Sequence, residues 1–133
     1  MLSNLSSLVA ESVSEDKNTS QLSIFNVLDS IMPEGFPLFL PRMAFFAIWT
    51  KEQSDPDIYS AIFTIRYLKK ILVETRLDLD FSGSIVSRSI IRISGFTVPG
   101  PGKLIFSLTT SSPKRIAKYI LNVTPPDTPK KID

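Results

Sequence analysis

A period-two alternation of apolar and polar residues limits most strongly what this chain can fold into. It is clearest between residues 71 and 81, where the odd positions hold a mainly apolar set: Ile71, Val73, Thr75, Leu77, Leu79 and Phe81. The even positions hold Leu72, Glu74, Arg76, Asp78 and Asp80. Successive side chains of a β-strand point to opposite faces, whereas a helix would mix the carboxylates into the apolar set. The segment is therefore predicted to be a half-buried strand.

Further runs rich in apolar residues recur along the chain, at residues 22–31, 42–51, 58–68, 85–93, 103–110 and 115–123. They are separated by turn-forming clusters such as Asp55-Pro56-Asp57 and Pro99-Gly-Pro-Gly102. Residues 42–51 are apolar almost throughout, which indicates a strand covered on both faces. Short strands at roughly 10–12-residue spacing predict an all-β fold, an antiparallel β-sandwich of about seven to eight strands, like an immunoglobulin or C2 domain in outline.

The chain of 133 residues has a length typical of one domain. We expect residues 1–123 to form that β-sandwich, and the Pro-rich residues 124–133 to form a flexible tail. The first dozen residues fit a helical turn as well as a strand, and residues 11–20 are polar and loop-like. The densest apolar run, residues 36–49, is shorter than a membrane span and is interrupted by Pro37, Pro41 and Arg42. With no secretory signal pattern either, we expect a cytoplasmic protein without a membrane partner.

Cysteine and histidine are both missing from the chain. Disulfides, thiolate nucleophiles, Cys/His zinc sites and Ser-His-Asp triads are therefore excluded, although a carboxylate, lysine or tyrosine enzyme is still conceivable. Glu74, Asp78 and Asp80 could supply a glycosidase pair, but Arg76 between them favours their ionised forms. The acidic turn 55–57 offers too few oxygens for calcium by itself. We therefore expect a non-enzymatic protein with no cofactor and no metal.

Two parts of the chain carry a resemblance to a known family. One is Gln21-Leu-Ser-Ile-Phe-Asn-Val-Leu-Asp-Ser-Ile31, followed by Phe36-Pro37 and by Pro41-Arg42-Met43. The other is Phe96-Thr-Val-Pro-Gly-Pro-Gly-Lys-Leu-Ile-Phe106, followed by a strand that ends at Val123. Over these residues the chain resembles an uncharacterised bacterial family of small β-sandwich proteins, known as a domain of unknown function. The resemblance implies the sandwich fold, and it brings no activity, ligand or catalytic residue with it.

A Phe-rich segment is the first candidate for a functional surface. Residues 36–40, Phe-Pro-Leu-Phe-Leu, are awkward for a regular strand, and exposed aromatic clusters mark protein interfaces. The candidate interface residues are Phe36, Leu38, Phe39, Leu40 and Trp49. Our leading hypothesis is a non-catalytic protein-interaction module or accessory subunit, whose partner is another protein or a second copy of this chain.

Four arginines, Arg66, Arg76, Arg88 and Arg92, are the second candidate, because neighbouring strands could align them across one sheet and so bind an anion. The alternative hypothesis is therefore a ligand-binding β-sandwich domain for an anionic ligand, or for a carbohydrate held by Trp49. Ordinary cross-strand pairing of these arginines with Glu74, Asp78 and Asp80 is the simpler interpretation.

The net charge of +2 conceals an uneven distribution along the chain. Residues 1–57 hold three basic and eight acidic residues, whereas residues 58–133 hold twelve basic and five acidic ones. If the two halves form separate surfaces, this difference could steer a partner or favour self-association. The basic half also keeps nucleic acid open as the weakest alternative partner.

Overall fold

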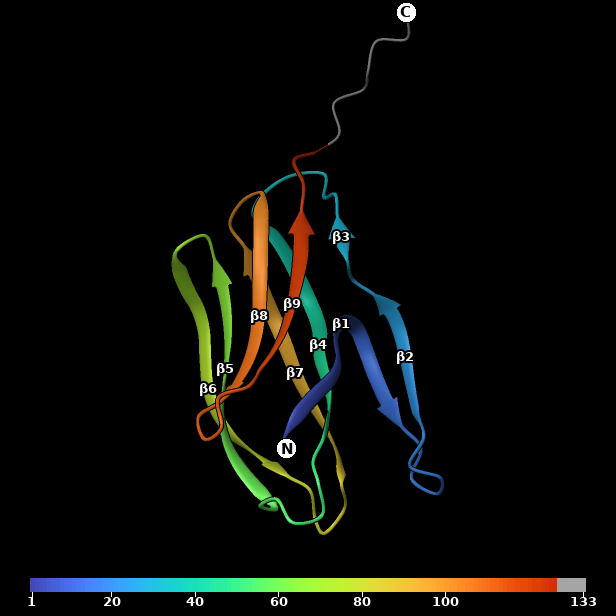
Figure 1. Ribbon diagram of the computed structural model, residues 1–133. Coiled ribbons are helices and arrows are strands. Elements are labelled where there is room, and N and C mark those ends of the chain that lie inside the picture. The colour runs from blue at the N-terminus through green and yellow to red at the C-terminus, as the bar shows by residue number, and fades with distance from the viewer. Residues whose placement is uncertain (127–133) are drawn as a thin grey trace, which may run out of the picture.

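A computed structural model describes residues 1–126, so the predicted tail from residue 127 onward lies outside the described residues. Residues 1–126 contain no helix and form nine strands in two packed sheets (Figure 1). The strands are β1 (Ser3–Glu15), β2 (Leu22–Val27), β3 (Ser30–Ile31), β4 (Leu38–Thr50), β5 (Ile58–Tyr67), β6 (Lys70–Asp80), β7 (Val86–Val98), β8 (Gly102–Thr110) and β9 (Ile116–Val123). The predicted all-β sandwich is confirmed.

The two sheets divide the chain largely by sequence. Sheet A has the strand order β2-β1-β4-β7, and sheet B has the order β3-β9-β8-β5-β6. All pairings are antiparallel except that of the two-residue β3, which runs parallel to β9. Apart from β7 and β3, sheet A is built from the acidic N-terminal half and sheet B from the basic C-terminal half. The two halves therefore interleave only slightly.

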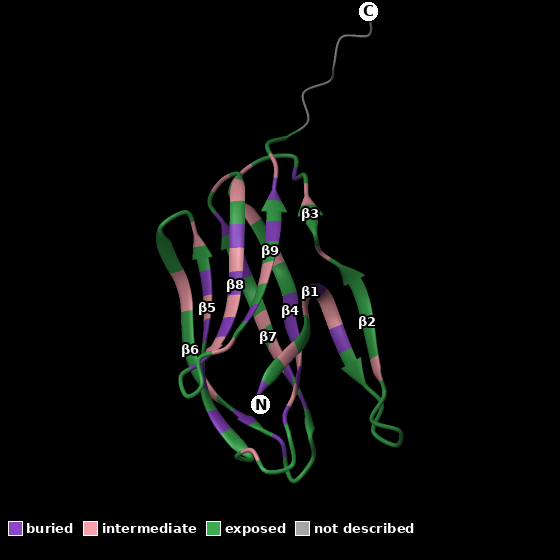
Figure 2. Cartoon of the chain, viewed as in Figure 1, coloured by how far each residue is buried: buried purple, intermediate pink, exposed green. Residues whose placement is uncertain are grey.

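The main core lies between the sheets, and the longer strands β4, β5, β8 and β9 contribute to it largely in alternation (Figure 2). At its centre the ring of Phe45 lies 5.3 Å from that of Phe63 and 6.3 Å from that of Phe106, measured between centroids. Trp49, from the same face of β4, is also fully buried. Burial of apolar side chains is the main favourable contribution to folding, and each of these large aromatic rings supplies a large share of it.

The structure differs from the sequence prediction at the N-terminal end. Residues 22–31, predicted as one strand, form β2 and β3 in different sheets, because the backbone leaves sheet A near Leu28 and joins sheet B at Ser30. The Leu28 amide still donates to Val9 of β1, whereas the Asp29 carbonyl accepts from Asn122 of β9. Residues 11–15, the first part of the segment 11–20 that was predicted to be a loop, belong instead to β1. The division of residues 22–31 adds one strand, and the inclusion of residues 11–15 lengthens β1.

A bulge also changes the face of one residue in the clearest alternation. The register between β5 and β6 shifts between Ile65 and Arg66, so that Arg66 pairs with Ile71. An extra residue in one strand reverses the alternation beyond it. Ile71 is therefore exposed on the outer face of sheet B, although the period-two pattern placed it with the buried set.

The outer face of sheet A is covered by the end of β1 and by β2, which we call the β1–β2 hairpin (residues 11–27). Val13 and Leu22 of the hairpin pack against Ala44 and Phe46 of β4 in a second, smaller apolar cluster. Two arginines of β7 hold the hairpin in place, as shown below. β4 therefore has the main core on one face and the hairpin on the other, which confirms the prediction that this strand is covered on both faces.

Candidate functional site: the open face of sheet B

The predicted interface around the Phe-rich segment does not form one surface. Phe36, Leu38 and Leu40 are partly buried and pack against the main core. Only Phe39 projects outward, with 61% of its surface exposed and its ring against Gly95. Trp49 has no exposed surface. The assignment of Trp49 to an interface or a carbohydrate site is therefore wrong, because the period-two alternation of β4 directs this ring into the core.

The four arginines do not form the predicted stripe, because they belong to both sheets. Arg88 and Arg92 lie on β7 in sheet A, where Arg92 Nη2 donates to the Val13 carbonyl at 3.0 Å and Arg88 pairs with Glu15 at 3.5 Å. Both contacts fasten the β1–β2 hairpin. Arg66 and Arg76 lie on β5 and β6 in sheet B, and neither forms a salt bridge with any residue from 1 to 126.

The acidic groups singled out from the sequence serve turns or lie exposed. Both carboxylate oxygens of Asp57 accept from the Gly83 amide at 3.0 Å, and the Asp55 carboxylate accepts from the Glu52 amide at 2.9 Å. Hydrogen bonds from the N-terminal ammonium and from Glu52 lower the pKa of Asp55. Asp80 accepts from the Ser82 amide at 2.8 Å. Within residues 1–126, no three carboxylates gather into a metal site.

The outer face of sheet B carries an ordered pattern of exposed side chains, and we call it the open face. Strand register aligns its side chains in three rows across β6, β5, β8 and β9. The rows are Arg76-Ile62-Thr109-Ile116, Glu74-Thr64-Ser107-Lys118 and Ile71-Arg66-Ile105-Ile120, and Asp78, Ser60, Ser111 and Lys114 adjoin the first row. Side chains at such positions lie about 4.5–5.5 Å from their cross-strand neighbours. The rows therefore form one continuous surface.

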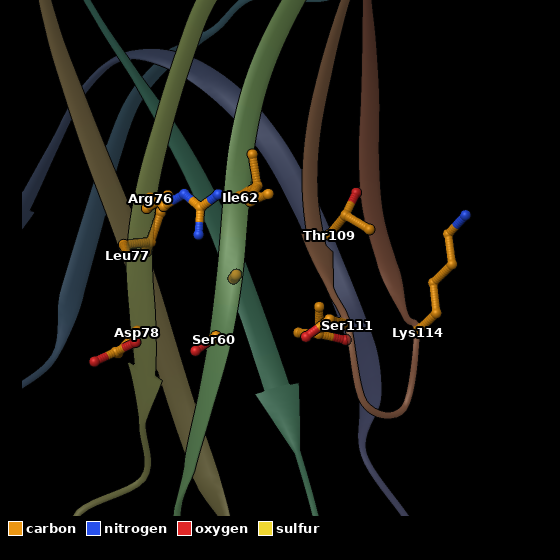
Figure 3. Close-up of a pocket in the computed structure, with 10 residues that line it drawn as sticks. Ser60, Ile62, Arg76, Leu77, Asp78, Thr109, Ser111 and Lys114 are labelled. Atoms are coloured by element: carbon orange, nitrogen blue, oxygen red, sulfur yellow. The ribbon is translucent and has the colours of Figure 1, made fainter.

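This surface is shallowly hollowed. Two adjoining depressions, of about 650 and about 520 Å³, share Ile62, Thr109 and Lys114 in their linings. Figure 3 shows the larger one, where the Arg76 guanidinium extends from β6 toward Ile62, and Lys114 rises from the β8–β9 turn on the other side. The hydroxyl-bearing side chains of Ser60, Thr109 and Ser111 lie between these two cations. The hollow is lined by apolar and hydroxyl groups and flanked by charges.

The charges of the open face are distributed in order across its width. Glu74 and Asp78 both lie on β6, at one edge, whereas Lys118 and Lys114 lie on β9 and in the turn before it, at the other edge. The middle strand β8 contributes only uncharged side chains to the three rows. With Arg66 and Arg76 included, the three rows and the residues that adjoin the first row hold four cations and two carboxylates, and Lys103 and Asp80 add one charge of each sign further along the same face. It is therefore basic overall and most basic at the β9 edge.

The apolar part of the open face is a set of isoleucines, whereas the solvent-facing side of an antiparallel sheet normally carries polar side chains. Ile116 is 50% exposed, and Ile62, Ile71 and Ile120 are also exposed. The sequence predicted apolar strands over residues 58–68, 71–81, 103–110 and 115–123, but these isoleucines were not among the candidate site residues. In the sequence, each of the four strands has an isoleucine at an outward-facing position. Recognising that these isoleucines lie on one surface requires knowledge of which strands are neighbours and of their register.

Comparison with models of known protein families gave no match, and comparison with curated protein sequences gave none either. The resemblance to a bacterial family of unknown function therefore stays a prediction. In residues 1–126, no helix has the length and apolar character needed to cross a membrane.

Proposed function

We propose that this protein is a non-catalytic interaction module or accessory subunit that binds a protein partner through the open face. The observation that carries the proposal is the presence of exposed isoleucines on β5, β6 and β9, with the half-buried Ile105 of β8 between them, within one surface. An antiparallel sheet with one face on the core normally presents polar side chains on the other face. Exposed apolar side chains interspersed with charged and hydroxyl-bearing ones on one surface are typical of a protein-binding surface.

The same surface favours a partner with acidic and apolar groups. Arg66 and Arg76 have no ion pair within the described residues, so their charges are free to meet carboxylates. Glu74 and Asp78 on the same face disfavour nucleic acid, whose affinity depends on the number of phosphates that cations neutralise. The cytoplasmic location expected from the sequence is part of this proposal.

Site-specific photocrosslinking tests it directly. A photoreactive amino acid at position 116, in the first row of the open face, should capture a protein in cells of the source organism. The matched control is position 85, where Ile85 is similarly exposed but lies in the turn before β7, with its carbonyl bonded to Lys51 and Thr50. Capture of the same proteins at both positions, or of none at position 116, would contradict the proposed function.

A second candidate function is supported by the larger depression alone. Arg76 and Lys114 flank a floor that includes Ser60 and Thr109, and cations with hydroxyl donors are groups that bind an oxyanion. Its volume lies within the range of small-ligand pockets, roughly 300–1,000 Å³. Titration with inorganic phosphate, followed by amide chemical shifts, should then perturb residues 109–114 and leave β7 unchanged. An Arg76→Met variant that binds phosphate as tightly as the wild type would refute this candidate.

A further inference from the structure

We infer that the partner of the open face is a second copy of this chain, which packs sheet B against sheet B around a two-fold axis parallel to the strands. This inference rests on the proposed function, because it names the partner of the same surface. The most common arrangement of two identical chains is a two-fold dimer in which each copy uses the same patch.

The two edges of the open face are complementary to each other, because its carboxylates lie on β6 and its lysines lie on β9 and in the turn before it. A two-fold axis in the plane of the interface and parallel to the strands places β6 of one copy over β9 of the other. It also keeps each row over its own counterpart. In the second row, Glu74 of each copy then faces Lys118 of the other, because these two residues end the row on β6 and β9. Beside the first row, Asp78 of each copy likewise faces toward Lys114 of the other.

The apolar residues match under the same operation. In the third row, Ile71 on β6 lies over Ile120 on β9 of the second copy, and in the first row the aliphatic stem of Arg76 lies over Ile116. An axis perpendicular to the strands would instead place β6 over β6 and β9 over β9. That arrangement brings carboxylates against carboxylates and lysines against lysines. The charges therefore select one orientation of the second copy.

The area of the open face indicates how strongly the two copies should bind each other. Four strands about 4.8 Å apart, with three rows about 7 Å apart, give a footprint on the order of 400 Å² in plan before side-chain relief is counted. Standard interfaces bury about 800 Å² per partner, so this dimer belongs to the small, reversible class. We expect a dissociation constant on the order of 1–100 µM, which sedimentation velocity over a wide concentration range can measure.

Charge reversal tests both the partner and the orientation. Lys118→Glu and Glu74→Lys should each place like charges opposite one another at two symmetric contacts, and each should weaken the dimer by at least about tenfold. The double variant with both changes should regain wild-type dimerisation. An equimolar mixture of the two single variants should form a heterodimer, because every reversed residue then faces its opposite. Ile85→Glu, outside the open face, should dimerise like the wild type.

The outcomes separate this inference from the proposed function. A wild-type chain that stays monomeric up to about 1 mM, while position 116 crosslinks to a different protein, overturns the inference and leaves the interaction module standing. A dimer that both single variants weaken, and that neither the double variant nor the mixture restores, overturns the orientation. Circular dichroism of each variant establishes that it is folded, and Glu74 and Lys118 are both exposed or partly exposed charged residues whose exchange leaves the core intact.

Discussion

Phe46 offers a direct test of how the β1–β2 hairpin is held on sheet A. Its side chain lies on the outer face of β4, is 7% exposed and packs in the small cluster with Ala10, Val13 and Ala44. The main core, on the other face of β4, does not include it. A Phe46→Ala variant therefore removes the centre of the hairpin's docking site and leaves the packing between the sheets unchanged.

The magnitude follows from the area that the ring buries. Fully burying a phenylalanine side chain is worth about 1.5–3 kcal/mol, and a truncation in a rigid core costs about 3–5 kcal/mol because a cavity is left. The hairpin can collapse onto the shortened side chain, so we expect a cost near the lower figures, about 2 kcal/mol. If the whole cost falls on the docking of the hairpin, the state in which the hairpin is detached from sheet A becomes about 30-fold more populated.

Native-state amide exchange measures this population. The amides of residues 12–15, which pair with β2, should exchange about 30-fold faster in Phe46→Ala, whereas those of β8 in the main core should change much less. Phe106→Ala is the matched control, because Phe106 is fully buried between the sheets and its loss should accelerate exchange throughout. Equal acceleration of residues 12–15 and β8 in Phe46→Ala would refute the view that the hairpin is a separately docked unit.

Three further predictions concern the fold. Gly95 has φ of +70° and a Cβ there would meet only the Phe39 ring at 3.6 Å, so Gly95→Ala should cost about 1–2 kcal/mol in urea unfolding through backbone strain alone. Tyr119→Phe removes the hydrogen bond that its hydroxyl donates to the Leu28 carbonyl at 2.8 Å and should cost about 1 kcal/mol. Burial raises the pKa of Tyr119, so the wild type should lose stability above pH 10 and this variant should lose less. Hydrogen bonds from Asn26 and Arg42 lower the pKa of Glu11, so its stabilising contribution should persist above pH 4.5 and disappear as the pH falls through that lowered value. Carboxyl NMR titration of Glu11 checks the midpoint.

The alternation of apolar residues was sufficient to predict the fold class, because a strand with one buried face leaves that pattern in the sequence. It also predicted that β4 is covered on both faces. The break at residues 28–29 could not be predicted in this way. Leu28 and Ile31 are both apolar and both pack against the same core, so the pattern runs on although the hydrogen-bond partner changes from β1 to β9.

The candidate site was less predictable, because it depends on which strands are neighbours. Arg66 and Arg88 look equivalent in the sequence, but one lies on the open face and the other fastens the hairpin. Trp49 illustrates a different error. As the only tryptophan of the chain, it was predicted to lie in an interface or a carbohydrate site. Its position in β4, two residues after the buried Ala47, instead directs its side chain into the core.

Both sheets have apolar side chains on their outer faces, but the chain covers only those of sheet A. Sheet A has an apolar outer face at Ala44, Phe46 and Ile90, and the chain covers it with its own hairpin, held by two arginines of β7. Sheet B also has isoleucines on its outer face, together with the free arginines Arg66 and Arg76, but its own chain places no such hairpin there within residues 1–126. The covered face shows how this chain buries an apolar sheet surface, with apolar contacts at the centre and arginine contacts at the side. A partner on the open face would likewise cover apolar side chains of a sheet, this time between molecules, and the separation of Glu74 on β6 from Lys118 on β9 makes an identical chain the partner that fits.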